Sequence, residues 1–273
     1  MERWWDTTEL EENVWYRWML NGAAVYLRRD ASLLTCAYTA ARWREKSRAA
    51  FEDQGALFGG PMDAPPPSDA VYTVTASASA QAAITPFLSG KPFLAGTEHL
   101  RLFPGAELSL RLELPPSLRL SASGETLFSF SPFIVNETWY GEDTMTGMLC
   151  YSLRASAPQI ADADPNDAFP RNAGAGIVCP LLVRNKSKTV LAFENLPLYT
   201  GELSIYELGR GTDAGLCTDT AVIDAWGGGE FRTSVRRPRD DDAYRLLCAG
   251  TESNMGDILI KQGTRIIKHA AGR

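Results

Sequence analysis

The strictest pattern in this sequence is an alternation of leucine with polar residues over residues 108–114. The segment LSLRLEL carries leucine at every second position, with Ser, Arg and Glu between them. Successive side chains of a β-strand point to opposite faces, so the leucines would line one face and the polar residues the other. Pro115-Pro116 then ends the run, because proline has no N–H to donate to a sheet. The pattern predicts a strand with one buried face and excludes a helix here.

Similar short runs rich in Val, Ile, Leu, Phe and Tyr recur about every ten residues from residue 70 onward, separated by turn residues. Spacing of this kind is typical of antiparallel sheets packed face to face. No long helical pattern exists that could supply repeated β-α-β crossovers, which argues against a doubly wound fold. We therefore predict a mainly β fold: an antiparallel β-sandwich with an N-terminal strand meander and at most one or two short helices.

Three regions follow from the distribution of turn and helix residues. Residues 1–58 would form the meander, with about three strands over 14–40, a type I′ turn at Asn21-Gly22, and a short helix or a loop over 41–54. Residues 59–69, which are rich in Pro and Gly, are predicted to be a linker without regular structure. Residues 70–273 would form the β-sandwich domain, packed with the N-terminal part as one globular unit.

Charge and cysteine content limit the location and the partners. The net charge of −6 disfavours a nucleic-acid binder, since neutralising phosphates requires a concentrated basic surface. No apolar run approaches the roughly 20 residues of a spanning helix, so no membrane insertion is expected. The acidic start does not resemble a signal peptide, and five scattered cysteines without a C-x-x-C pair suit a reducing compartment. We expect a cytoplasmic protein with buried, free thiols.

Residue types that carry catalysis are scarce. Histidine occurs only at His99 and His269, and neither lies in a nucleophile motif. The glycines at 227–229 lack the lysine of a phosphate-binding loop. The acidic loop 162–167 could offer oxygen ligands to calcium, but it lacks the EF-hand spacing and is predicted to be a solvated connector. We predict no cofactor and no metal site, and enzymatic activity is disfavoured.

The segment NETWYGED contains the strongest candidate for sugar chemistry. Glu137, Glu142 and Asp143 flank Trp139-Tyr140, and carboxylates beside aromatic rings are typical of carbohydrate sites. A pair of carboxylates could also serve as acid and base in glycoside hydrolysis. The alternative, which we favour, is a polar hairpin in which Trp139 anchors the core.

Tryptophans near the N-terminus offer a second candidate surface. Trp15 and Trp18 lie within a predicted strand and are expected in the core, whereas Trp4 and Trp5 precede it and are expected to be exposed. Tryptophan is enriched at the energetic centres of protein interfaces. Trp4 and Trp5 are therefore predicted to dock a partner.

Several motifs together resemble the domain-of-unknown-function 432 family of bacterial and archaeal proteins. They are a Trp/Tyr-Gly turn leading into a Cys-Tyr strand, a Val-Arg-Asn-Lys-Ser turn and a Leu-Pro-x-Tyr strand end, at residues 139–141, 150–151, 183–187 and 196–199. The motifs are short and structural, and the family brings no functional residue to this chain. The resemblance implies that relatives are encoded near small mechanosensitive channels, and hence an accessory or regulatory role.

Together these observations predict a non-enzymatic binding or accessory protein. A protein partner, such as a membrane channel or another complex, or self-association is expected rather than a small molecule. The alternative function is a carboxylate-dependent carbohydrate-active enzyme or carbohydrate-binding module.

Overall fold

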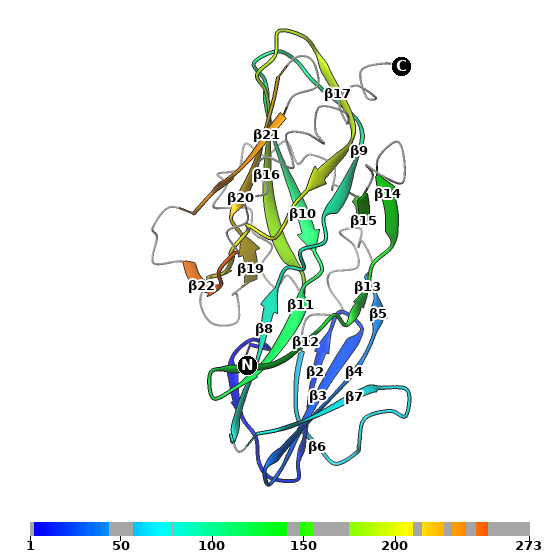
Figure 1. Ribbon diagram of the computed structural model, residues 1–273, viewed down its shortest axis with the longest axis vertical. Coiled ribbons are helices and arrows are strands. Elements are labelled where there is room, and N and C mark those ends of the chain that lie inside the picture. The colour runs from blue at the N-terminus through cyan, green and yellow to red at the C-terminus, as the bar shows by residue number, and fades with distance from the viewer. Residues whose placement is uncertain are drawn as a thin grey trace.

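The structure is a computed structural model, and it describes residues 3–43, 57–77, 79–140, 148–154, 175–209, 215–226, 231–238 and 244–250. Within these residues the regular structure consists of β-strands alone, in several sheets (Figure 1). The predicted mainly β class, built from antiparallel sheets, is confirmed. No helix in the described part of the chain is long and apolar enough to cross a membrane.

The strands of the N-terminal meander belong to a five-stranded sheet at one end of the elongated molecule, together with two later strands. Its strands, in spatial order, are β6 (Leu57–Met62), β2 (Trp15–Leu20), β3 (Ala23–Asp30), β4 (Leu33–Thr39) and β7 (Val71–Ala76). Asn21 and Gly22 join β2 to β3 with φ of 47° and 88°, so both turn residues have the positive φ of a type I′ hairpin. The predicted hairpin is confirmed.

Two expectations for this region need correction. Residues 59–62 were expected to lack regular structure, but they lie in β6, an outer strand where glycine and proline are tolerated. Residues 41–42 begin the segment that was predicted to be a short helix or a loop, but they form the short strand β5 (Ala41–Arg42), which pairs with β13 (Phe133–Ile134). Residues 44–56 lie outside the described part of the chain.

A four-stranded sheet packs against the meander. Its strands, in spatial order, are β1 (Thr7–Glu9), β8 (Gln81–Phe87), β11 (Ser117–Ala122) and β12 (Glu125–Phe130). Tyr38 of β4 stacks on Phe130 of β12, with ring centroids 4.8 Å apart. The two sheets alternate along the chain: β1 pairs with β8 in the four-stranded sheet, whereas β7, which lies between them in sequence, pairs with β4 in the five-stranded sheet.

The other end of the molecule contains two further sheets (Figure 1). One has four strands: β14 (Glu137–Tyr140), β15 (Met148–Arg154), β9 (Phe93–Leu102) and β17 (Leu191–Leu198). The other has seven: β21 (Phe231–Arg236), β20 (Thr220–Ala225), β16 (Ile177–Asn185), β19 (Gly215–Thr218), β18 (Ile205–Leu208) and β22 (Tyr244–Cys248), with β10 (Glu107–Leu114) also paired to β16.

Strand β10 has the burial that its alternation predicts. Leu110, Leu112 and Leu114 are buried, and the strand ends directly before Pro115-Pro116. The sheets are mostly antiparallel as expected, but β16 runs parallel to β19 and β20, and β15 runs parallel to β9. Periodicity indicates which face of a strand is buried and carries no information about the direction of its partner.

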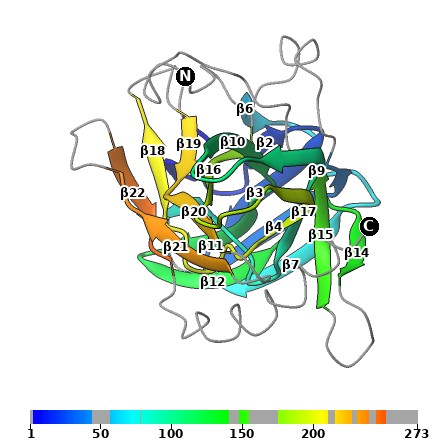
Figure 2. The same cartoon turned by 90° about the horizontal axis from the view of Figure 1, so that it is seen from above.

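One contiguous hydrophobic core joins the two ends of the molecule. It includes Trp18 and Leu27 of the meander, Leu120 of the four-stranded sheet with β11, and Leu112 and Val183 of the large sheet. Seen from above, β14 and β15 lie on the opposite side of the molecule from β21 and β22 (Figure 2). The two sides of the fold therefore offer separate surfaces.

Candidate functional site

The hairpin of β14 and β15 presents an exposed tryptophan. Trp139 lies directly opposite Leu149, and Glu137 lies opposite Tyr151, so these four side chains share one face of the hairpin. Trp139 is 47% exposed and Leu149 is 43% exposed. We call Lys91, Glu137, Trp139, Leu149 and Tyr151 the Trp139 surface. The preferred expectation, in which Trp139 anchors the core, is wrong, because β14 is an outer strand and this part of its face is not covered.

Lys91 holds the charged side of this surface in place. Its ammonium forms an ion pair with the Glu137 carboxylate and lies 4.6 Å from the centroid of the Tyr151 ring. Tyr151 in turn packs against the buried Phe93 at 5.3 Å. An ammonium over an aromatic face is electrostatically attracted to the ring. The Glu137 carboxylate is therefore paired with a cation.

The opposite face of the hairpin is turned inward. Tyr140 is half-buried there, next to Cys150, and the Tyr199 hydroxyl donates a hydrogen bond to the sulfur of Met148 at 3.0 Å. Burial raises the pKa of the Cys150 thiol to about 11 and that of Tyr199 to about 12. Both groups are thus protonated at neutral pH, and Cys150 is not an activated nucleophile.

The predicted carbohydrate residues are only partly brought together. Glu137 and Trp139 share a face, whereas Tyr140 points to the other side because adjacent strand residues alternate. Glu142 and Asp143 lie outside the described residues, as do the acidic loop 162–167 and His269. Within the described residues, no group of His, Cys, Asp and Glu side chains is arranged to hold a metal ion.

The expectation that Trp4 and Trp5 are exposed is wrong. Their side chains are 3% and 9% exposed, with the two rings edge to face at 5.3 Å. The Trp5 indole donates a hydrogen bond to the buried Glu207 carboxylate at 3.3 Å, and Arg245 donates to the same oxygen at 2.7 Å. The indole of Trp5 thus finds its hydrogen-bond partner, Glu207, 202 residues away in the sequence. No local sequence pattern could predict that contact.

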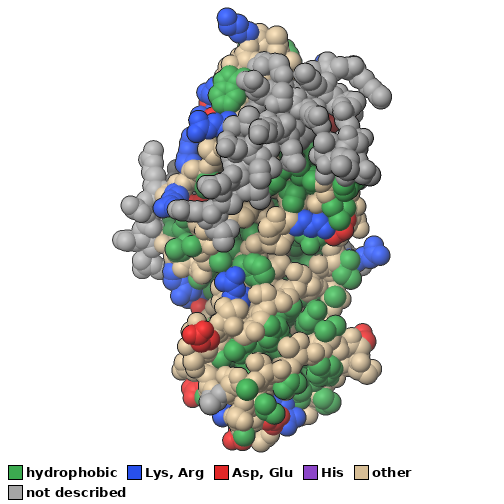
Figure 3. Space-filling view, viewed as in Figure 1, with side chains coloured by type: hydrophobic (Ala, Val, Ile, Leu, Met, Phe, Trp, Pro, Cys, Tyr) green, Lys and Arg blue, Asp and Glu red, His purple; other side chains and the backbone are tan. Residues whose placement is uncertain are grey.

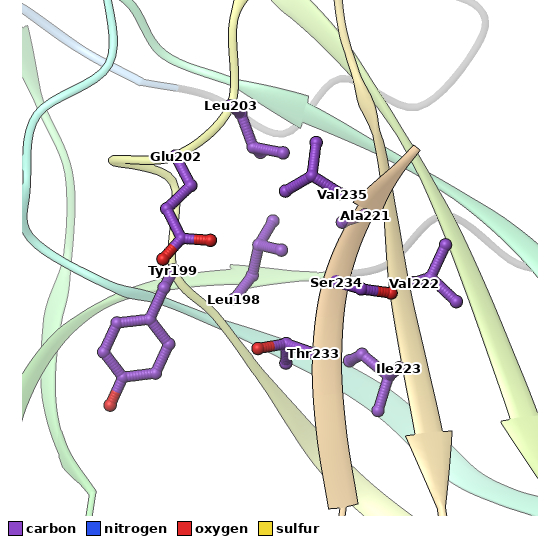
Figure 4. Close-up of a pocket in the computed structure, with 10 residues that line it drawn as sticks. All are labelled: Leu198, Tyr199, Glu202, Leu203, Ala221, Val222, Ile223, Thr233, Ser234 and Val235. Carbon is purple, nitrogen blue, oxygen red and sulfur yellow. The ribbon is translucent and has the colours of Figure 1, made fainter. Parts of the chain in front are cut away.

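The cavity beside the seven-stranded sheet offers little space for a small molecule. Figure 4 shows a cavity lined by residues of β17, β20 and β21 and by the segment that holds Glu202 and Leu203. The space inside this cavity is about 20 Å³, which admits roughly one water molecule. Drug-sized ligands occupy pockets of about 300–1,000 Å³. A ligand of that size does not fit this cavity.

A second exposed apolar surface was not foreseen from the sequence. In strand β7, Val71, Tyr72 and Val74 are 51%, 47% and 58% exposed. In Figure 3 many hydrophobic side chains are visible at the end of the molecule that holds the five-stranded sheet. The signal that could have identified this surface is the absence of any charged residue over 71–80.

No curated protein and no solved structure matches the chain. A protein-family comparison, by contrast, matches residues 4–241, which include the hairpin of the Trp139 surface and the strands of all the sheets except β22. The chain therefore belongs to the family described as protein of unknown function DUF432.

Proposed function

We propose that this protein is a non-enzymatic accessory protein that docks a protein partner on the Trp139 surface. The observation that carries the proposal is the exposed pair of Trp139 and Leu149 beside a fixed ion pair. Interface hot spots are enriched in tryptophan and tyrosine and are surrounded by residues that exclude water. The Trp139 surface has this composition, with two aromatic rings, one aliphatic side chain and a charged rim.

The stiffness of the surface supports the same proposal. Tyr151 is held between Phe93 and Lys91, and Lys91 is held by Glu137. A surface that is already ordered loses little side-chain entropy when a partner binds. Such a surface suits recognition of a partner.

Affinity isolation with matched variants tests this proposal. The tagged chain would be purified from its native cells as wild type, as Trp139→Ala and as Leu246→Ala, and recovered proteins would be quantified. Leu246 is 55% exposed on β22, on the opposite side of the molecule, and serves as the control. We expect a partner with the wild type and with Leu246→Ala, and at least about a tenfold loss with Trp139→Ala. Equal recovery with all three chains would contradict the proposal.

The identity and location of the partner are part of the same proposal. We infer a cytoplasmic protein because all five cysteines are free thiols, which suits a reducing compartment. The resemblance to the family further leads us to propose a membrane channel as the partner. Isolation from detergent-solubilised membranes would recover such a channel, and its absence from that fraction would remove this part of the proposal.

A carbohydrate is the second candidate ligand, because an exposed indole beside a carboxylate can stack on a sugar ring. Electrophoresis through gels that contain polysaccharides would show retardation of the wild type and not of Trp139→Ala. Normal migration in every gel would eliminate this candidate.

A further inference from the structure

The outer strands of the sheets are protected against pairing with other chains, with one exception. Natural proteins block such edges with charged residues, proline, bulges or very short strands. Among the described outer strands, a charged residue occurs in β1, β10, β12, β14, β21 and β22. Strand β6 contains two glycines and a proline, and β17 contains Glu194 and Pro197. Strands β5 and β13 have only two residues each. Strand β7, with the sequence VYTVTA, has none of these devices.

The geometry of β7 makes this edge suitable for pairing. Its six residues pair with β4 without any register shift, from Val71 opposite Tyr38 to Ala76 opposite Leu33. Its other side ends the sheet, so this edge carries backbone groups that no neighbouring strand of the sheet pairs. Val71, Tyr72 and Val74 are all about half exposed, and Leu33 beside them is 45% exposed. The edge is regular, apolar and uncharged.

We propose that β7 pairs with β7 of a second copy of this chain, antiparallel about a two-fold axis through Thr73. In this register Thr73 lies opposite Thr73 of the other copy, Tyr72 opposite Val74, and Val71 opposite Thr75. Residues that lie directly opposite each other in an antiparallel pair point to the same face. Each face of one sheet therefore continues into the corresponding face of the other sheet. The two five-stranded sheets would join into one continuous sheet.

The sequence of β7 is complementary to itself in this register. The symmetric pairing creates two Tyr–Val pairs and one Thr–Thr pair, and aromatic–β-branched and Thr–Thr pairs are among those that stabilise antiparallel strands. Asp69, the nearest acid before the strand, falls opposite Ser77 and not opposite another acid. No like charges lie opposite each other. The second copy therefore provides cross-strand partners for the side chains of β7 and hydrogen-bond partners for its backbone.

The mass of the chain in solution tests the dimer. Light scattering coupled to gel filtration should give twice 29.9 kDa for the wild type, shifting toward the single-chain mass on dilution. Val74→Lys should raise the dissociation constant by at least about tenfold, because it removes both Tyr–Val pairs and places lysine at the edge. Val190→Lys is the control, since Val190 is 48% exposed and lies outside β7, and it should leave the dimer unchanged. Unchanged melting temperatures would show that both variants fold.

Cysteine crosslinking tests the register. Both cysteine variants are made in a Cys36→Ala background, because Cys36 of β4 lies directly opposite Thr73 in the same chain and would compete for the new thiol. Thr73→Cys then places two thiols opposite each other across the axis, and oxidation should link the copies. Thr75→Cys is the matched control on the same face of the strand. In the proposed register its two copies are offset by four residues, or about 13 Å, too far for a disulfide. A wild type that is monomeric at its highest soluble concentration, a Val74→Lys variant that remains dimeric, or equal crosslinking at positions 73 and 75 would each overturn the proposal.

Discussion

The side chain of Asn185 connects the turn that contains Ser187 and Thr189 to Leu102, at the end of strand β9. Its side-chain oxygen accepts hydrogen bonds from the Ser187 amide at 2.8 Å and the Ser187 hydroxyl at 2.7 Å. Its side-chain nitrogen donates to the carbonyls of Leu102 and Thr189, both at 2.8 Å. The residue is 1% exposed, so these bonds satisfy the whole amide in a buried place. The local turn was predictable from the Asn-Lys-Ser sequence, whereas the bond to Leu102 joins residues 83 positions apart.

Replacing Asn185 should therefore destabilise the fold strongly. Asn185→Ala leaves two carbonyls without their donor, and each unsatisfied buried polar group costs about 1–3 kcal/mol. We expect the free energy of unfolding, measured with urea, to fall by about 2–5 kcal/mol. Asn185→Asp should be similarly harmful, because a carboxylate would face the same carbonyls. Lys188→Ala, at an exposed position in the same turn, should stay within about 0.5 kcal/mol. A mild effect of Asn185→Ala would show that water replaces the lost donor.

At the scale of elements, local patterns predicted strands well and their pairing poorly. The alternation that defines β10 and the Asn-Gly pair between β2 and β3 depend on neighbouring residues, and both predictions are confirmed. The parallel pairing of β16 with β20 depends on the path of the whole chain. The exposure of β7 likewise depends on which strand ends its sheet.

The β2–β3 hairpin offers a test of backbone conformation with a matched control. Gly22 has a φ of +88°, and an added Cβ would lie 3.6 Å from that of Ala41, an ordinary contact. Gly22→Ala should therefore cost about 1–2 kcal/mol through backbone strain rather than through a clash. Gly90→Ala should change the free energy of unfolding little, since Gly90 has no positive φ and an added Cβ would meet no atom within 4 Å. Equal effects of both variants in urea unfolding would contradict this explanation.

At the scale of the whole molecule, the candidate sites depended on contacts that are distant in sequence. Trp5 is buried because Glu207 accepts its indole N–H, and Trp139 is exposed because β14 ends its sheet. Composition predicted a tryptophan-based surface and could not say which tryptophans form it. The same global packing buries four of the five cysteines, which gives the fold a characteristic dependence on pH.

Burial raises the pKa of Cys179 and Cys217 from 9.0 to about 12, and it also raises the pKa of Cys36. Above pH 9 the unfolded chain loses these protons while the folded chain keeps them, so stability must fall as the pH rises from about 9 toward 12. Each thiol contributes at most about 1.4 kcal/mol per pH unit. Below pH 8 these groups are protonated in both states and have no effect.

Urea unfolding between pH 7 and pH 10 would measure this loss before tyrosine, with an ordinary pKa of 10.0, begins to contribute strongly. The wild type should keep its stability to about pH 8 and lose it steeply above pH 9. A Cys179→Ala, Cys217→Ala double variant starts from lower stability because it leaves small cavities, but its slope above pH 9 should be shallower by up to about 2.7 kcal/mol per pH unit. If the slopes of the two proteins coincide, these thiols ionise as readily in the folded chain as in the unfolded one, and burial in this core does not control their protonation.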